Sequence, residues 1–191
     1  MKKRLVAIFD LDDTLSDTAQ RRHLVEPAEG VKKNWDEFFK RAHLDEERPW
    51  MVGRALELAG LGVEIVIFTG RPENGRQESM AWLAERGIEP ELARFRRFKD
   101  FRKTAKMKGD WLEELSAQEG VEIICAVDDE PTNLAAFAAA GIFVIDATQV
   151  EPAHALFELL KARLALGVEA AVKPAEDGAG PRAQGIGAGR A

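Results

Sequence analysis

The sequence predicts an α/β fold in which helices cover both faces of a parallel sheet. Short apolar runs rich in Val, Ile and Phe recur along the chain, at residues 5–9, 63–68, 121–127 and 142–145. They lack the strict alternation of apolar and polar residues, as is typical of parallel strands buried on both faces. Helical patterns separate them, at residues 49–59, 73–86, 106–118, 131–140 and 152–166. This alternation predicts a Rossmann-like, doubly wound sheet with right-handed crossovers.

Glycine and proline support these boundaries. Pro131 suits the first position of a helix, where its missing N–H costs nothing. Glycines stand where four helices should end, at Gly60, Gly87, Gly120 and Gly141. Residues 93–98 are a weaker strand candidate because charged residues interrupt the apolar ones.

The chain of 191 residues fits one domain, predicted over residues 1–166, with a small insertion. Residues 16–48 form a long polar segment between the first strand and the next helix. Four of its apolar residues share one helical face, which predicts a small helical cap: Trp35, Phe38, Phe39 and Ala42. Residues 167–191 are rich in Gly, Ala and Pro, so we expect a flexible tail.

Composition narrows the functional classes. The net charge of −6 argues against a nucleic-acid-binding surface that covers the whole protein, so any basic site must be local. Cys125 is the only cysteine and lies in an apolar run, so we expect a core residue and a reducing, cytoplasmic environment. The apolar stretch near the N-terminus stops at Asp10, which is too early for a signal peptide or a membrane span.

A cluster of carboxylates follows the first apolar run. Asp10, Asp12, Asp13 and Asp17 lie within eight residues, directly after residues 5–9. Carboxylates this close repel one another, so the segment either holds a cation or is freely solvated. A single Asp-x-Asp is more often a solvated turn.

Two other strand ends favour a site over a solvated turn. Thr69, Gly70 and Arg71 follow the strand at 63–68, and an Asp128-Asp129 pair follows the strand at 121–127. Ligands of open parallel sheets bind beyond the carboxyl ends of the strands, so these groups should meet at one edge. Coincidence of three independent placements is the signature of a functional site.

This inventory suits phosphoryl transfer through an aspartyl phosphate. A carboxylate that attacks a phosphate dianion needs Mg²⁺ to offset the repulsion. A second carboxyl must protonate the leaving oxygen, which requires neighbouring carboxylates to raise its pKa. A hydroxyl, backbone amides and a guanidinium are suited to stabilising the transferring oxygens.

The segment at residues 9–15, FDLDDTL, resembles the first motif of the haloacid dehalogenase (HAD) superfamily of phosphohydrolases. The resemblance implies that Asp10 is the nucleophile and a Mg²⁺ ligand. It implies that Asp12 is the general acid/base and gives its backbone carbonyl to the metal. Thr69 matches the phosphate-binding hydroxyl of the second motif, and Asp128 and Asp129 match the acids that complete the metal site. Position 13, often glycine in this superfamily, is an aspartate to which we assign no role.

One branch of the superfamily is especially similar, the branch of the phosphatase domain of phage polynucleotide kinase/phosphatase and its stand-alone relatives. The similar segments span roughly residues 5–165 and include Trp35-Asp36-x-Phe38-Phe39, Thr69-Gly70-Arg71, Asp100-x-Arg102-Lys103 and Met107-Lys108. By this resemblance the lysine of the third motif is Lys108, with Lys103 and Lys106 as alternatives by position. It also implies substrate-phosphate contacts from Leu11, Gly70, Arg71 and Lys103. A structural salt bridge is the alternative for Arg71.

We therefore expect a Mg²⁺-dependent phosphomonoester hydrolase that acts through an aspartyl phosphate on nucleic-acid 3′-phosphate ends or on nucleotides. A nucleotidase-like phosphatase of small molecules is the first alternative. A catalytically silent binding module with the same fold is the second, and phosphotransfer to an acceptor other than water is the third.

Residues 94–108 reverse the charge of this acidic protein. They contain eight basic residues and a single acid, Asp100. Phe95, Phe98 and Phe101 are interleaved with the basic residues. Such a stretch can guide a polyanion and stack an aromatic ring on a base. It can equally be a solvated basic edge whose phenylalanines face the core, and the sequence leaves both interpretations open.

Overall fold

The computed structural model describes residues 3–166. The predicted flexible tail at 167–191 lies outside the described residues. Within the described part, no helix has the length and apolar character needed to cross a membrane.

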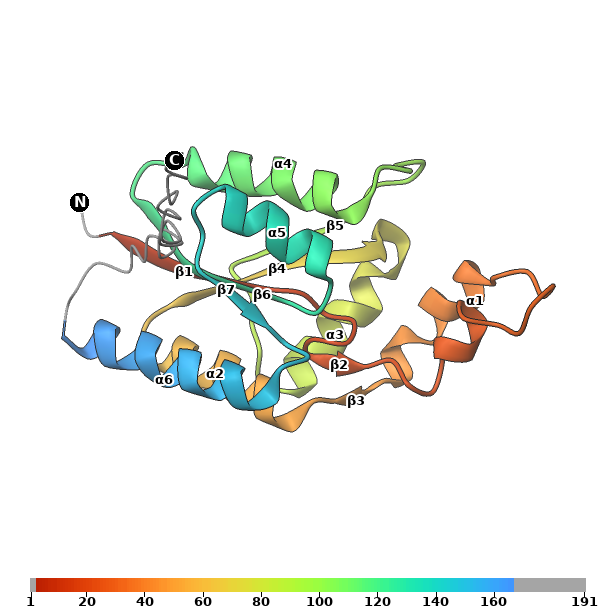
Figure 1. Ribbon diagram of the computed structural model, residues 1–191, viewed down its shortest axis with the longest axis horizontal. Coiled ribbons are helices and arrows are strands. Elements are labelled where there is room, and N and C mark those ends of the chain that lie inside the picture. Colours follow the sequence, from red (N-terminus) through yellow and green to blue (C-terminus); the bar gives the residue numbers. More distant parts are fainter. Residues whose placement is uncertain (1–2, 167–191) are drawn as a thin grey trace, which may run out of the picture.

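The predicted parallel sheet forms the centre of the molecule, with five strands in the order β5-β4-β1-β6-β7 (Figure 1). The strands are β1 (Arg4–Phe9), β4 (Glu64–Pro72), β5 (Leu92–Arg96), β6 (Val121–Asp128) and β7 (Val144–Asp146). The weaker candidate at 93–98 is therefore a true strand at the edge. β4 continues four residues past its predicted end at 68, so the Thr69-Gly70-Arg71 segment is part of the strand.

Helices cover both faces of the sheet (Figure 1). One face carries α2 (Pro49–Gly60), α3 (Arg76–Glu85) and α6 (Val150–Ala165). The other face carries α4 (Thr104–Ser116) and α5 (Pro131–Ala139). The helix predicted at 73–86 begins instead as a 3-10 turn at Glu73–Gly75, and α3 follows it.

The central strand β1 explains why the apolar runs show no polar alternation. Ala7 and Phe9 belong to the core on one face of the sheet, whereas Val6 and Ile8 belong to the core on the other. All four are at most 1% exposed. Burying apolar surface on both faces stabilises the sheet by about 25 cal/mol per Å².

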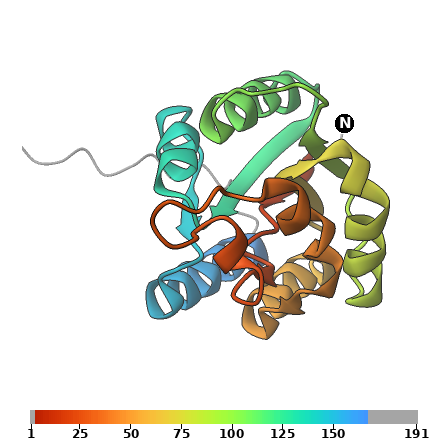
Figure 2. The same cartoon turned by 90° about the vertical axis from the view of Figure 1, so that its right-hand side faces the viewer.

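The insertion between β1 and α2 projects from the carboxyl ends of the strands (Figure 2). A two-stranded antiparallel sheet of β2 (Ser16–Asp17) and β3 (Glu46–Glu47) closes its base. Between them lie α1 (Trp35–Lys40) and two 3-10 turns, at 22–24 and 42–44. The Asn34 side chain caps α1 by accepting a hydrogen bond from the Glu37 amide at 3.0 Å. The predicted helical face is only partly buried: Phe38 is 6% exposed, but Trp35 is 49% exposed.

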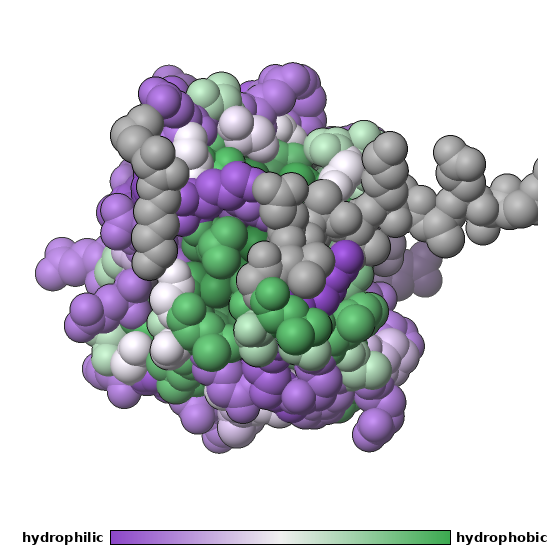
Figure 3. Space-filling model, turned by 90° about the vertical axis from the view of Figure 1, so that its left-hand side faces the viewer, coloured by the Kyte–Doolittle hydropathy of each residue, from purple (hydrophilic) through white to green (hydrophobic). Residues whose placement is uncertain are grey.

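The opposite end of the molecule, at the amino ends of the strands, differs in character. Hydrophobic residues gather in the middle of this face and hydrophilic residues surround them (Figure 3). The polar groups predicted to carry chemistry belong to the other end.

Candidate active site

Three parallel strands bring their terminal polar residues to one edge of the sheet. β1 lies between β4 and β6, and Phe9 is level with Ile67 and Val127. The residues that follow, Asp10 on β1 and Asp128 on β6, therefore leave the sheet side by side. The Asp10 amide donates to the Val127 carbonyl at 3.0 Å, which fixes the turn away from the strand.

Lys108 joins these two carboxylates from α4. Its Nζ lies 2.7 Å from Asp10 Oδ1 and 2.6 Å from Asp128 Oδ2, and the lysine is 1% exposed. Lys106 instead pairs with Asp110 at the surface, at 2.6 Å, and Lys103 is exposed. Of the three candidate lysines, the structure thus places only Lys108 in the carboxylate cluster.

The cluster has the composition of a cation site. Oxygens of Asp10, Asp128 and Asp129 all lie within 4.8 Å of one another. Asp128 is oriented by Asn133 Nδ2 at 2.8 Å. One ammonium against three carboxylates leaves two negative charges uncompensated, which matches the charge of a divalent cation. Carboxylate oxygens are the donors that hard divalent cations prefer, so these residues fit such an ion.

The pKa values reflect the crowding of like charges. Burial raises the pKa of Asp10 well above its usual value; Lys108 opposes the shift, and the neighbouring carboxylates add to it. Burial, together with the charge of Asp128, raises the pKa of Asp129 to about 7. Burial alone would lower the pKa of Lys108, but Asp10 and Asp128 outweigh it and raise the pKa.

Asp12 belongs to a separate, buried ion network. Asp12 Oδ1 accepts hydrogen bonds from Arg71 Nη2 and Arg21 Nη2, both at 2.6 Å. Asp45 binds the same two guanidinium groups, with Oδ2 at 2.5 Å from Arg21 Nη2 and 3.1 Å from Arg71 Nη2. The network links the end of β1, β4 and both ends of the insertion.

This network sets the ionisation of Asp12. Burial opposes the charged form, but Arg71 and Arg21 outweigh it and hold the pKa of Asp12 below its usual value. The prediction that neighbouring carboxylates raise the pKa of this carboxyl is therefore wrong. Neighbouring carboxylates raise the pKa of Asp10 and Asp129 instead, because Asp12 faces the two arginines.

Sequence reasoning missed Arg21 and Asp45. Both are nearly fully buried, at 1% and 4% exposure. Each lies in a polar segment with no strand or helix period to mark it as internal. The same network buries Arg71, which is 1% exposed. Its ion pairs with Asp12 and Asp45 are those of a structural salt bridge, which was the alternative to a phosphate-binding role. Contact of Arg71 with a substrate phosphate stays a prediction.

The remaining predicted residues differ in what they can offer. The Thr69 hydroxyl is buried and accepts from the Arg71 amide at 3.1 Å, which leaves its own hydrogen free to donate. Leu11 has a fully buried side chain, so only its backbone can face a ligand. Gly70 packs closely on α4, where a Cβ would lie 3.4 Å from Thr104 Cγ2. Lys103 makes no ion pair within residues 3–166 and stands apart from the cluster.

Asp13 has a structural explanation. Its φ of +56° lies in the left-handed region, which glycine adopts most easily. Its carboxylate accepts from the Thr18 hydroxyl and from Arg22, each at 2.7 Å, and its carbonyl accepts from Arg48. These contacts hold the turn after β1, so an aspartate is compatible with a position that favours glycine.

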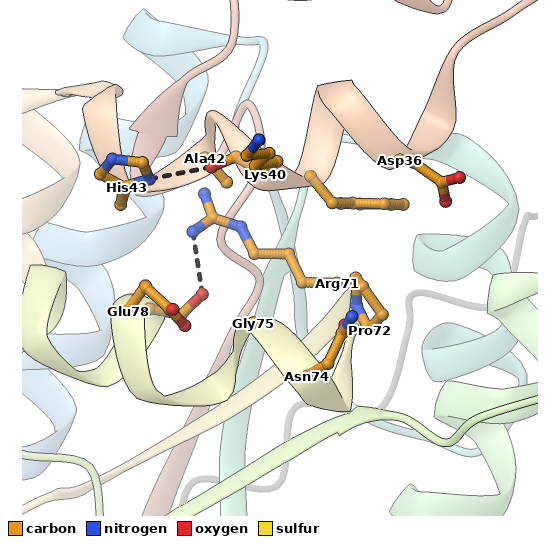
Figure 4. Close-up of a pocket in the computed structure, with 11 residues that line it drawn as sticks. Asp36, Lys40, Ala42, His43, Arg71, Pro72, Asn74, Gly75 and Glu78 are labelled. Carbon is orange, nitrogen blue, oxygen red and sulfur yellow. Dashed lines mark hydrogen bonds between the residues drawn. The ribbon is translucent and has the colours of Figure 1, made fainter.

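A cavity of about 470 Å³ lies between the insertion and the junction of β4 with α3 (Figure 4). Asp36, Lys40 and His43 line it from the insertion, and Asn74 and Glu78 line it from the other side. Arg71 reaches between the two walls. Because the same guanidinium binds Asp12, the cavity adjoins the predicted chemical site.

Residues 1–150 match the model of a family described as HAD superfamily, subfamily IIIB (Acid phosphatase). The chain belongs to this family. Membership of this HAD phosphatase family agrees with the parallel sheet and with the acidic cluster at its carboxyl edge. No curated protein matches the chain significantly in sequence.

Solved structures share the HAD fold at low identity. A chain of the Pnkp1/Rnl/Hen1 RNA repair complex matches with a TM-score of 0.60 and 19% identity, over 75% of this chain and 42% of that one. The class C acid phosphatase from Bacillus anthracis with tungstate bound matches with a TM-score of 0.52 and 17% identity, over 85% and 64%. Mycobacterium tuberculosis Protein Tyrosine Kinase A matches with a TM-score of 0.54 and 20% identity, over 76% and 83%. The chain thus spans less than two thirds of the length of the repair-complex chain and of the class C acid phosphatase.

We predict that Asp129→Asn stabilises the cation-free protein but abolishes its stabilisation by divalent cations. With a pKa of about 7 in the folded state and an ordinary pKa of about 4 when unfolded, ionising Asp129 costs stability as the pH rises through this range. The gain from asparagine should therefore be complete above about pH 7 and vanish towards about pH 4. Thermal unfolding with a chelator and with added cation measures both effects. If divalent cations do not change the unfolding temperature of the parent protein, the assignment of Asp129 to a cation site is wrong.

We predict that Asp45→Asn lowers the free energy of unfolding by about 3 kcal/mol, because it leaves buried guanidinium charge undercompensated. Urea unfolding measures this change. Asp36→Asn in the same insertion serves as the matched control, because Asp36 has no ion pair within residues 3–166. Equal stability of the two variants would show that the network contributes little.

Proposed function

We propose that the protein is a Mg²⁺-dependent phosphomonoester hydrolase that forms an aspartyl phosphate on Asp10. The observation that carries this proposal is the convergence of Asp10, Asp128, Asp129 and Lys108 on one edge of the sheet. The Thr69 hydroxyl lies near the carboxyl end of the neighbouring strand β4. Family membership supports the phosphatase activity.

The carboxylates of Asp10, Asp128 and Asp129, together with the backbone carbonyl of Asp12, would hold Mg²⁺. When bound, this ion offsets the repulsion between the Asp10 carboxylate and a phosphate dianion. Lys108 contributes a fixed positive charge 2.7 Å from Asp10 Oδ1, which favours the ionised form of the nucleophile and orients it.

In the first step, an Asp10 oxygen bonds to phosphorus while the bond from phosphorus to the ester oxygen breaks. Asp12 gives its proton to the departing alkoxide, so the alcohol leaves neutral. In the second step, Asp12 takes a proton from water as the water oxygen attacks phosphorus. The bond to Asp10 breaks, inorganic phosphate leaves, and both aspartates return to their starting states. Thr69, the Leu11 and Gly70 amides and Arg71 stabilise the oxygens of the transferring phosphate.

The first step requires a protonated Asp12, whereas the two arginines favour its ionised form. A substrate phosphate beside Arg71 would share the guanidinium and weaken its hold on Asp12. The pKa of Asp12 would then rise when substrate is present. Substrate binding would in this way prepare the general acid.

We further propose that the substrate is a nucleic-acid 3′-phosphate end or a nucleotide. The motifs shared with the polynucleotide phosphatase branch support this class, as does the similar fold of a chain in an RNA repair complex. The cavity beside Arg71 is large enough for a leaving group, and it includes the aromatic ring of Phe39 and the amide of Asn74. Both groups suit a nucleobase.

A phosphatase of small molecules is the second candidate. The observation in its favour is the family model itself, whose description is that of an acid phosphatase. In that case the cavity would hold the whole leaving group, and no part of the substrate would extend beyond the cavity.

We predict that Asp10→Asn lowers hydrolysis of a chromogenic phosphate ester by at least about a thousandfold, because the amide cannot attack phosphorus. Asp17→Asn is the matched control: this exposed carboxylate accepts only the Ala19 amide within the described residues and should leave the rate unchanged. Phosphate release with Mg²⁺ measures both variants. An Asp10→Asn protein as active as its parent would refute the mechanism, and an inactive parent would favour the binding module.

We predict that oligonucleotides with a 3′-phosphate are hydrolysed with a kcat/KM at least about tenfold above that of 5′-phosphorylated oligonucleotides and free nucleotides. A polymer end gains contacts beyond the reacting phosphate, and each factor of ten needs only about 1.4 kcal/mol. A phosphate-release assay over this panel measures the ratio. Equal turnover of all three would favour the small-molecule phosphatase, and product that requires an added acceptor would indicate phosphotransfer.

A further inference from the structure

The loop between β5 and α4, residues 97–103, combines exposed aromatic rings with basic side chains. The exposure of the three phenylalanines decides which of them face the core and which could contact a ligand. Phe95, still in β5, is 2% exposed and packs in the core. Phe98 and Phe101 are 87% and 91% exposed. Exposing two nearly bare phenylalanines within four residues forgoes burial of apolar surface, which calls for a functional explanation.

The loop holds a definite shape. The Arg96 guanidinium donates to the carbonyls of Asp100 and Arg102, at 2.9 and 2.8 Å. The Asp100 amide donates to the Arg97 carbonyl at 3.1 Å, which closes a turn around Lys99, whose φ is +60°. The rings are therefore presented by an ordered turn, which reduces the entropy lost when a ligand binds.

Two cations of the loop, Lys99 and Lys103, have no carboxylate partner within residues 3–166. Arg97 makes no ion pair there, although its charge helps to lower the pKa of Glu73. Other basic side chains nearby are compensated, since Arg102 pairs with Asp100 and Asp110. Lys99 instead places its ammonium 5.3 Å from the centre of the Phe98 ring. Uncompensated positive charge beside an aromatic face, on a protein of net charge −6, is suited to a polyanion that carries rings.

The loop adjoins the proposed phosphate site. At its start, Arg96 is level with Pro72 of β4 and donates to the Gly70 carbonyl at 3.4 Å. At its end, Thr104 packs on Gly70, and α4 then carries Lys108 to Asp10. The loop projects from the same end of the molecule as the insertion (Figure 1).

We propose that this loop is a binding surface for a single-stranded nucleic acid, with bases stacked on Phe98 and Phe101 and phosphates paired with Arg97, Lys99 and Lys103. The inference extends the proposed function, since the strand would lead its 3′-phosphate end to Asp10. A single strand fits because its bases can unstack from one another and turn their faces to the rings, whereas a duplex hides them. The surface acts on the nucleotides before the terminal phosphate, outside the cavity beside Arg71.

The test measures binding apart from catalysis. A fluorescent single-stranded oligonucleotide with a 3′-hydroxyl is titrated with the Asp10→Asn protein, so that neither hydrolysis nor a terminal phosphate contributes. The double change Phe98→Ala with Phe101→Ala should weaken binding by about tenfold to a hundredfold. Leucine at both positions keeps apolar bulk without a ring and should lose nearly as much, whereas tryptophan should restore the parent affinity. Leu61→Ala, at a residue 54% exposed at the end of α2, is the control.

Charge is tested separately through salt dependence. Binding should weaken as salt rises, and Arg97→Ala or Lys99→Ala should each flatten the logarithmic slope by about 0.7. Parent-like affinity of the alanine or leucine double variants would overturn the proposal, as would an equal loss in Leu61→Ala. A parent that binds no oligonucleotide would also overturn it and point to a protein partner for this surface.

The two proposals fail in different ways. Loop-dependent binding without hydrolysis of any 3′-phosphorylated strand would refute the proposed substrate and leave the binding surface standing. Hydrolysis of 3′-phosphate ends that is unaffected by the loop variants would refute the binding surface alone.

Discussion

The structure depends on the pairing of buried and partly buried carboxylates with cations that come from distant parts of the chain. Asp10, Asp128, Asp12 and Asp45 gather at one sheet edge, where their mutual repulsion would be prohibitive in isolation. Lys108 compensates the first two, and Arg21 and Arg71 compensate the others. Because these cations come from α4, the insertion and β4, the same ion pairs that permit the site also fix how three elements meet.

The carboxylate cluster around Asp10 and the ion network around Asp12 differ in their charge balance. Around Asp10 the compensation is incomplete, so the carboxylates keep a demand for positive charge that a divalent cation can meet. Around Asp12 two guanidinium groups face two carboxylates, and the local charge is balanced. Trp82 Nε1 adds a hydrogen bond to the Asp45 carbonyl at 2.8 Å, which ties the base of the insertion to α3. One group is thereby poised to bind, and the other holds the insertion over the site.

Local patterns explain which parts the sequence could predict. Apolar runs and the polar residues that follow them identified the central strands, Asp10, Thr69 and Asp128, because strand ends in a parallel sheet share an edge. Lys108 could be named only through family resemblance, since Lys103 and Lys106 precede the same apolar face. Arg21 and Asp45 were missed because they are 24 residues apart in the insertion, where no helix or strand period relates them. The lowered pKa of Asp12 was missed as well, because it depends on the positions of Arg21 and Arg71.

The distribution of charge determines from which side a polyanion can approach the site. The protein is acidic as a whole, so a polyanion is repelled by most of its surface. Cations without ion pairs stand in the loop at 97–103, which is joined to the carboxyl end of β4 through Arg96. In the proposed binding mode, a nucleic-acid strand drawn to that loop would be held next to Asp10, whereas a small phosphate ester would gain nothing from the loop. Discrimination between polymer ends and free nucleotides can thus arise outside the reacting centre, where binding contacts leave the chemistry of Asp10 and Asp12 unchanged.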